Sequence, residues 1–392
     1  MRAAPRTAAA TPLDAVRALG PSIRAAADRT ERDRRVPPEV VDALARAGVF
    51  RLCVARAYGG LEADVATLLA TLAAVAEADA STGWCAMIGA TSGLVSGYLA
   101  PADAREIYGR DPLVVTGGVF APKGKAVAVA DGYRVRGRWA FASGCQHCAW
   151  LLGGCVVFDD GTPRLLPRGI PDARMMLFPA AEVEIVDTWT VAGLRGTGSH
   201  DIAVTDVFVP AGRAVSLTTD APREAGALYR FPAFGLLALG IAAVALGNAR
   251  RALDEIGLVA SDKTPTGSQR LVRERAVVQA ALARAEAGLR AARAFLAEAV
   301  AEAWDEAARD GAIALPRRLA LRLAATHATE AATRAVDAAW EAGGGTAIYA
   351  ASPLERCFRD AHVLTAHVMV APATWELAGR LLLGVDTDTA ML

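Results

Sequence analysis

The chain has 392 residues, of which 53% are hydrophobic and 21% are charged. Such a composition can bury a large core, which excludes intrinsic disorder as the main state, and the length favours two or three domains. The 42 basic and 42 acidic side chains cancel, so the chain lacks the basic surplus typical of a nucleic-acid-binding protein.

The first part of the chain, residues 1–110, predicts an N-terminal α-helical domain. An alanine- and leucine-rich stretch at 61–78 shows the helical pattern. Pro5, Arg6 and Asp14 interrupt the N-terminal residues, which leaves no continuous apolar stretch for a secretory signal. We therefore expect a cytoplasmic protein.

Residues 111–220 change to a period of two and predict a central β-domain. Strands are expected in GYRVRGRWAF at 132–141 and in IAVTDVFVP at 202–210. No helical stretches alternate with these strands, which argues against a parallel, doubly wound sheet.

Residues 221–392 return to a helical period and predict a C-terminal helical bundle. Apolar residues recur at steps of three and four from Val278 to Trp304, the pattern of one long bundle helix. The most apolar segment, 231–247, is shorter than the roughly 20 residues of a membrane span and contains proline and glycine. It predicts a buried bundle helix, and we expect no membrane partner.

The ends of the last helices carry clear signals. Pro316 is expected to open one helix and the glycines at 343–345 to close it. Ser352-Pro-Leu-Glu355 matches a capping box with proline at the first helical position. The final helix is expected to run toward Val370 before Pro372 interrupts it.

Three motifs that could indicate a metal, redox or phosphate site have simpler interpretations. Cys145 and Cys148 form a CxxC without a second pair, which favours core cysteines in a reducing compartment over a zinc or redox site. The stretch GLRGTGS at 193–199 fits neither a P-loop nor a dinucleotide fingerprint. His362 and His367 are five residues apart, roughly 140° around a helix, so they cannot share a ligand and no metal is expected.

Three segments together resemble the acyl-CoA dehydrogenase superfamily. They are DGYRVRGRWAFASG at 131–144, WTVAGLRGTGSHD at 189–201 with DVFVP after it, and the stretch from GGG to RDAH at 343–362. The resemblance covers about 35–390. It implies an α+β fold with an N-terminal helical domain, a central antiparallel β-domain and a C-terminal four-helix bundle. It also implies a homotetramer with a flavin between the β-domain and the bundle.

Within the superfamily, the chain looks like the two-component flavin-dependent monooxygenases, such as the oxygenase components of hydroxyphenylacetate and secosteroid phenol hydroxylases. The dehydrogenases' glutamate in a TyrGluGly-type turn is missing, and His367 stands in this region. This branch implies that a separate NAD(P)H:flavin reductase supplies loosely held, reduced FMN or FAD. Reaction with O2 as co-substrate gives a C4a-hydroperoxyflavin, which hydroxylates an aromatic or nitrogen centre of a small molecule, here expected in secondary metabolism.

The resemblance also implies roles for individual residues. Ser143 matches the serine near flavin N5, and His367 matches the proposed acid/base, whose usual pKa near 6.5 lets it hold either protonation state. The implied cofactor-binding set is Phe141, Ser143, Trp189, Arg195, Thr197, Ser199 and Lys263. A histidine that relatives carry after the SerxGlyTrp segment is missing, so the substrate wall is expected to be Trp84, Met87 and Ser92.

Two alternatives stay open at this point. The first is an acyl-CoA dehydrogenase-like flavoenzyme that desaturates a thioester, which would hold FAD tightly and reduce it with substrate. The second is a non-catalytic family scaffold, which would bind no flavin. The sequence leaves open the substrate, the choice between FMN and FAD, the reductase, and whether another group replaces the missing histidine.

Overall fold

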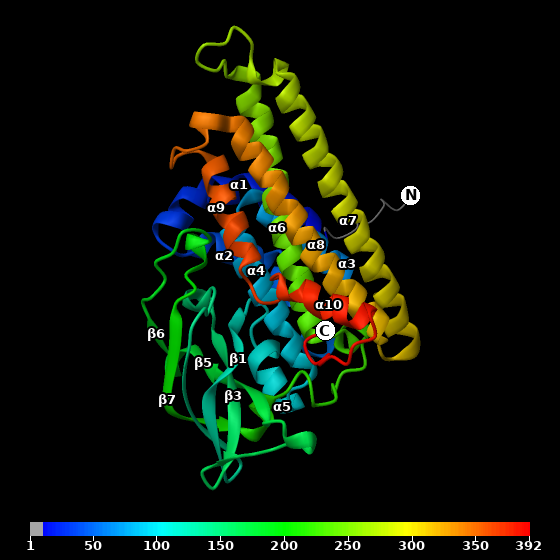
Figure 1. Cartoon of the computed structure of the whole chain (residues 1–392). Coiled ribbons are helices and arrows are strands. Elements are labelled where there is room, and N and C mark those ends of the chain that lie inside the picture. The colour runs from blue at the N-terminus through cyan, green and yellow to red at the C-terminus, as the bar shows by residue number, and fades with distance from the viewer. Residues whose placement is uncertain (1–10) are drawn as a thin grey trace, which may run out of the picture.

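The computed structural model describes residues 11–392, apart from the side chains of residues 168 and 310. Of the N-terminal residues weighed for a secretory signal, those at 1–10 lie outside this description. Helices from both ends of the chain pack together, and the sheet domain lies against one end of this helical body (Figure 1).

The N-terminal part is helical, as predicted. Its helices are α1 (Pro12–Arg32), α2 (Pro38–Arg46), α3 (Val65–Ala78), α4 (Ala80–Ser92) and α5 (Pro101–Ala104). Carboxylates at the helix starts accept hydrogen bonds from otherwise unpaired amides, as Asp64 does for α3 and Asp79 for α4. Asp79 both ends α3 and caps α4, so these two buried helices are fixed relative to each other.

The middle of the chain forms an eight-stranded sheet with strand order β6-β7-β2-β1-β3-β5-β8, and β4 pairs with β3. The strands are β1 (Thr116–Val129), β2 (Gly132–Trp139), β3 (Trp150–Asp159), β4 (Thr162–Pro163), β5 (Ala173–Pro179), β6 (Glu184–Val186), β7 (Asp201–Pro210) and β8 (Ala214–Val215). All pairs among the described residues are antiparallel except β1 with β3, which the sequence pattern did not predict. Because β2 and β3 flank β1, the chain between them crosses the end of β1.

The sheet core forms around Trp139, whose side chain is fully buried and whose indole N–H donates to the Gly154 carbonyl over 2.7 Å. Three strand glycines lie against this ring, at 124, 137 and 153, where any Cβ would overlap the indole. Cys145 belongs to the same core, and burial raises the pKa of its thiol to about 12. This placement agrees with the predicted core cysteine.

The C-terminal part is a helical bundle with one further helix. Its helices are α6 (Ala233–Asp262), α7 (Ala276–Asp310), α8 (Leu315–Gly343), α9 (Pro353–Thr365) and α10 (Ala373–Leu382). By length and composition alone α6 could cross a membrane, but 83% of its most apolar window is buried inside the protein. At Gly247 it approaches the backbone of α3 so closely that a Cβ would overlap the Ala73 carbonyl. Its apolar character therefore serves packing, as predicted.

Two details of the last helices differ from expectation. Ser352 precedes α9, but its side chain makes no capping hydrogen bond, so the predicted capping box is wrong. The helix ends at Thr365, five residues before the predicted end at Val370. The imidazole Nδ1 of His367 accepts the Met369 amide over 3.2 Å, which competes with helical pairing, and Pro372 lacks the N–H that a continuing helix needs. His367 consequently lies in a turn.

Candidate active site

Two loops at one end of the sheet bring together most of the predicted flavin residues. The first loop, 140–149, connects β2 to β3 and contains Ser143. The amide of Ala142 donates to the His200 carbonyl over 3.0 Å, and the amide of Gly144 donates to the Thr197 carbonyl over 2.9 Å. These bonds fix the first loop against the second loop, 187–200.

A chain of hydrogen bonds, which we call the hydroxyl relay, joins α4 to both loops. Trp84 Nε1 lies 2.8 Å from Ser143 Oγ, which lies 2.6 Å from Ser199 Oγ. Ser199 Oγ lies 2.7 Å from Thr197 Oγ1, and Thr197 donates to the Leu194 carbonyl over 2.8 Å. All four side chains are buried.

The direction of every bond in the hydroxyl relay follows from its two ends. An indole N–H can only donate and a carbonyl can only accept. Thr197 gives its hydrogen to the Leu194 carbonyl, so Ser199 must donate to Thr197, and Ser143 must donate to Ser199. Ser143 accepts from Trp84 and keeps one unused lone pair. It is therefore prepared to accept one more hydrogen bond, but not to donate one.

Helix α9 anchors the second loop. Asp360 Oδ1 accepts the Leu194 amide over 2.6 Å, and burial raises the pKa of this carboxyl to about 7. Leu194 has a φ of 50°, in the left-handed region, so the turn needs such an anchor. Gly193 passes so close to the Arg359 carbonyl that a Cβ there would overlap it. Glycine at this position therefore serves close packing.

His367 approaches the hydroxyl relay from the bundle. Its ring lies edge-on to Trp84 with a centroid distance of 5.6 Å. Since Nδ1 accepts the Met369 amide, the ring hydrogen of the neutral form is on Nε2. Burial, and after it the positive charge of Arg322, lower the pKa of His367 to about 4. This shift favours the neutral imidazole at pH 7 more strongly than the usual pKa near 6.5 does.

Two aromatic side chains lie at the edge of this cluster. Phe141 and Trp189 meet edge-on with centroids 6.0 Å apart, and Trp189 Nε1 donates to the Leu194 carbonyl over 3.1 Å. Phe141 has a φ of 67° and 70% of its surface is exposed. A large apolar ring held outward by a strained backbone fits contact with a flat ligand. Arg195 is exposed nearby, with Nη1 3.5 Å from Glu31.

Three of the predicted site residues lie apart from this cluster. Lys263 donates to the Gly343 carbonyl over 2.5 Å, where α6 and α8 end. Met87 is buried against Gly240 of α6. Ser92 lies two turns along α4 from Trp84, and its hydroxyl donates to the Ile88 carbonyl over 2.7 Å. Their roles stay predictions.

Sequence reasoning missed Asp360 and Arg322. Asp360 lies in the segment 343–362 that carries the resemblance, but no role was predicted for it, although its side chain anchors the second loop. Arg322 is buried on α8, three residues after Leu319 and four before Thr326. The sequence signal that could have indicated this buried arginine is its helical spacing from core positions.

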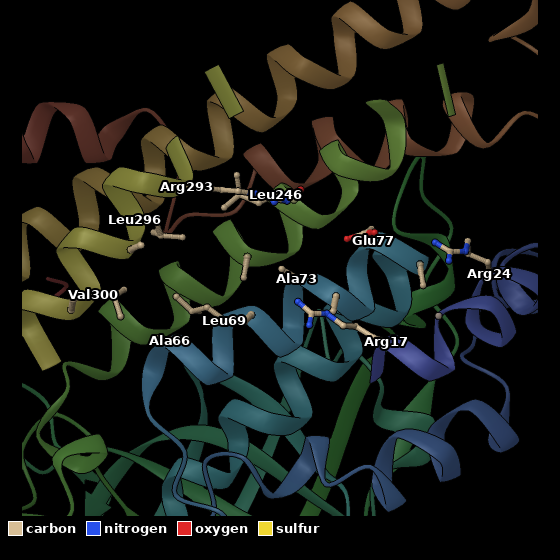
Figure 2. Close-up of a pocket in the computed structure, with 17 residues that line it drawn as sticks. Arg17, Arg24, Ala66, Leu69, Ala73, Glu77, Leu246, Arg293, Leu296 and Val300 are labelled. Atoms are coloured by element: carbon tan, nitrogen blue, oxygen red, sulfur yellow. Dashed lines mark hydrogen bonds between the residues drawn. The ribbon is translucent and has the colours of Figure 1, made fainter. Parts of the chain in front are cut away.

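Two cavities of the described chain lie away from these residues. One, of about 580 Å³, lies between α1, α3, α6 and α7, with Arg17, Arg24, Glu77 and Arg293 among its lining side chains (Figure 2). The other, of about 710 Å³, lies beside Arg51 and Tyr58. Within residues 11–392 no group of three His, Cys, Asp or Glu side chains could hold a metal ion.

Comparison with known families matches both helical parts of the chain. Residues 14–102 match the acyl-CoA dehydrogenase N-terminal domain, and residues 239–372 match the acyl-CoA dehydrogenase C-terminal domain. The fold and the flavin-type site thus define an acyl-CoA dehydrogenase-like flavoprotein.

Full-length relatives identify the branch. The indole-3-acetate monooxygenase of Pseudomonas putida is 33% identical, covering 98% of this chain and 97% of the relative. The oxygenase subunit HsaA of a flavin-dependent monooxygenase from Mycobacterium tuberculosis is 32% identical, covering 92% of each. The FADH2-dependent resorcinol hydroxylase, oxygenase component, of a Rhizobium species is 30% identical, covering 93% and 91%.

A solved structure supports the same assignment. The 3-HSA hydroxylase of Rhodococcus sp. RHA1 superposes with a TM-score of 0.90 at 28% identity, covering 98% of this chain and 100% of that one. The chain belongs to the flavin-dependent monooxygenases of the acyl-CoA dehydrogenase superfamily, as an oxygenase component, and it is an oxidoreductase.

Proposed function

We propose that this oxygenase hydroxylates a small aromatic substrate, using reduced FAD that a separate NAD(P)H:flavin reductase delivers. The observation that carries the choice of reduced flavin is the direction of the hydroxyl relay. Reduced flavin carries a hydrogen on N5, whereas N5 of oxidised flavin is an acceptor. Ser143 has a lone pair free and its hydrogen committed to Ser199, so it matches the reduced ring.

The residues present fit a flavin at this place. Phe141 and Trp189 offer apolar surface for the ring, Ser143 offers an acceptor for N5–H, and Arg195 offers an exposed cation for a phosphate. FAD is proposed over FMN because a relative uses FADH2. When bound, reduced flavin supplies the two electrons with which O2 gives one oxygen atom to the substrate and one to water.

His367 is proposed to accept a proton from the substrate. Its Nδ1 accepts the Met369 amide and carries no hydrogen, so Nε2 is the ring nitrogen that remains available to a substrate. Acceptance of the proton uses the other tautomer, with its hydrogen on Nδ1, in which the bond from the Met369 amide is given up and the free lone pair of Nε2 takes a phenol or ring N–H proton. Trp84 then forms the wall between this base and Ser143.

The desaturating alternative finds no base in this cluster. Abstraction of a thioester α-proton requires a carboxylate free to reach the substrate. Asp360 is buried and accepts the Leu194 amide, and Glu376 is exposed on α10. The monooxygenase function therefore agrees better with the side chains present.

The proposal is tested by supplying the purified chain with FAD, NADH, a flavin reductase and O2 and screening phenols and indoles. We expect a hydroxylated product with one oxygen atom from 18O2, and no product when the reductase is omitted. Substrate-driven bleaching of oxidised flavin by acyl-CoA thioesters without O2 would contradict the proposal. Absence of any flavin binding would support the non-catalytic scaffold.

We further propose a cytoplasmic homotetramer acting in secondary metabolism. Large apolar side chains are exposed where α6 ends, α7 begins and α8 is followed by a loop, namely Leu258, Val277, Ile348 and Tyr349. Lys263 lies at this end of the bundle. We interpret this apolar surface as a contact with another copy of the chain. Light scattering tests the interpretation, and the expected mass is that of four chains.

A further inference from the structure

The buried cation Arg322 has no carboxylate partner among the described residues. Only 5% of its surface is exposed. Nη1 lies 3.2 Å from the thioether sulfur of Met369, and Nε has no hydrogen-bond partner in the described part of the chain. Burial lowers the pKa of this guanidinium. Buried charges are normally paired, so this arrangement indicates that an anion completes the site.

A second buried arginine, Arg51, has oxygen acceptors that Arg322 lacks. Arg51 is 6% exposed, and its guanidinium donates to the carbonyls of Tyr58 and Gly59 over 2.5 and 3.3 Å, while its Nη1 has no partner among the described residues. Within residues 11–392 Arg322 has no oxygen acceptor of this kind. The two sites therefore differ in their oxygen acceptors, although both side chains are almost fully buried.

Two further buried hydroxyls, one on α8 and one on α10, have no partner among the residues that the structure describes. Thr326 lies one turn further along α8 and is fully buried, and Thr374 lies at the start of α10. Within residues 11–392 neither Oγ1 has a hydrogen-bond partner. Trp375 donates to Glu330 over 2.6 Å, which holds the start of α10 against this stretch of α8.

This polar group continues into the proposed reaction centre. Met369 contacts Arg322 through its sulfur and His367 through its amide. The charge of Arg322 also contributes to the lowered pKa of His367, in agreement with these shared contacts. An anion held by Arg322 therefore lies beside the base and the Trp84 wall.

We propose that Arg322, with the hydroxyls of Thr326 and Thr374, binds a carboxylate group of the aromatic substrate. The inference rests on the proposed function and adds the substrate class, an aromatic carboxylic acid. A single guanidinium supplies one positive charge and the two threonines supply neutral donors, which matches a monoanion. A phosphate dianion would leave one negative charge uncompensated in a buried site. The flavin phosphates are therefore the second source, to be distinguished by experiment.

Binding is measured by calorimetry without flavin, reductase or O2, so that this test is independent of oxygenation. The probes are two carboxylate and carboxamide pairs of equal shape, indole-3-acetate with indole-3-acetamide and phenylacetate with phenylacetamide. For at least one pair we expect the wild type to bind the carboxylate about 10- to 100-fold more tightly, the range of a charge-assisted contact. Arg322→Gln should reduce this preference to less than threefold and leave FAD affinity unchanged.

Arg334→Gln is the matched control, because Arg334 is exposed on the same helix and pairs with Glu330. It should keep the full preference. Equal binding within both pairs, no binding of either carboxylate to the wild type, or an unchanged preference in Arg322→Gln would each overturn the proposal. Loss of FAD affinity in Arg322→Gln would also overturn it and assign the charge to the cofactor.

Folding of the variants supplies a second measurement that needs no probe. Arg322→Met removes an unpaired buried charge and should raise the melting temperature of the flavin-free protein. Arg51→Met removes hydrogen bonds to two carbonyls and should lower it. A lower melting temperature for Arg322→Met would mean that the charge is already satisfied within the chain, which contradicts the proposal. A protein that binds carboxylates through Arg322 but makes no product would refute the proposed function alone.

Discussion

Ser199→Ala tests the hydroxyl relay through the redox state of the flavin it prefers. In the wild type Ser143 donates to Ser199, so its hydrogen is unavailable to oxidised flavin N5. Removing the Ser199 hydroxyl frees that hydrogen, while the lone pair for the N5–H of reduced flavin is unchanged. We therefore expect tighter binding of oxidised FAD and unchanged binding of reduced FAD.

The size of the effect follows from one neutral hydrogen bond. Such a bond contributes a net ~0.5–1.5 kcal/mol, so oxidised FAD should bind about two- to twelvefold more tightly to Ser199→Ala. Ser143→Ala acts on the other redox state, because it removes the acceptor, and should weaken reduced FAD by a similar factor. Both variants lower the preference for reduced flavin, through opposite changes in affinity.

The assay combines an anaerobic titration of each redox state with the midpoint potential of bound FAD. About 30 mV corresponds to a tenfold change in a two-electron couple, so the potential should fall by roughly 10–30 mV in either variant. Ser96→Ala is the control, because Ser96 is also buried but accepts the Ala55 amide away from the hydroxyl relay. Unchanged or weakened binding of oxidised FAD in Ser199→Ala would refute the bond directions deduced here.

Other residues give predictions of different kinds. His367→Ala should keep FAD binding and the circular dichroism spectrum while lowering product formation by about 10²–10⁴, and an unchanged yield would remove His367 from the mechanism. Burial, first among the causes, lowers the pKa values of His367 and His147 from 6.5 to about 4. Between these pH values the two histidines bind protons in the unfolded chain but not in the folded chain, so their contribution to stability falls as pH decreases from 6.5 to 4, whereas Asp360, with its raised pKa, contributes in the opposite direction. The urea midpoint of the wild type should therefore fall more, or rise less, toward pH 4 than that of a variant with both histidines replaced by glutamine, and equal slopes would contradict this. Gly193→Ala places a Cβ on the Arg359 carbonyl and should cost about 1–3 kcal/mol in urea unfolding. Gly379→Ala, in open space on α10, should be neutral or stabilising, and equal costs at both sites would refute the packing argument.

Patterns local in sequence predicted the architecture well. Apolar residues recur with a helical period, then with a period of two, and then with a helical period again. This change located the sheet domain between two helical parts. The glycines after 342 ended α8 as expected, because Gly344 adopts a φ of 51° that other residues avoid. The parallel pairing of β1 with β3 could not be read in the same way. It depends on which edge of β1 the chain reaches after the 140–149 loop, and alternation of side chains is the same for either edge.

The candidate site was predictable only in part. The resemblance located Ser143, Thr197 and Ser199, yet not the bonds among them, since these need residues 84, 143 and 199 to meet in the folded chain. His367 was assigned to a helix because its neighbours are apolar. Its own imidazole accepts the Met369 amide and favours a turn instead, a competition that hydrophobic periodicity does not register.

The position of the second loop depends on charges from both ends of the chain. Glu31 of α1 accepts hydrogen bonds of 2.7 Å from Arg356 and Arg359 of α9. Burial raises the pKa of Glu31, but these two arginines outweigh burial and lower it. Arg359 also donates to the Ala192 carbonyl over 2.7 Å. One network of ion pairs and hydrogen bonds therefore joins α1, the second loop and α9. The position of the flavin-facing loop consequently depends on helices from both ends of the chain.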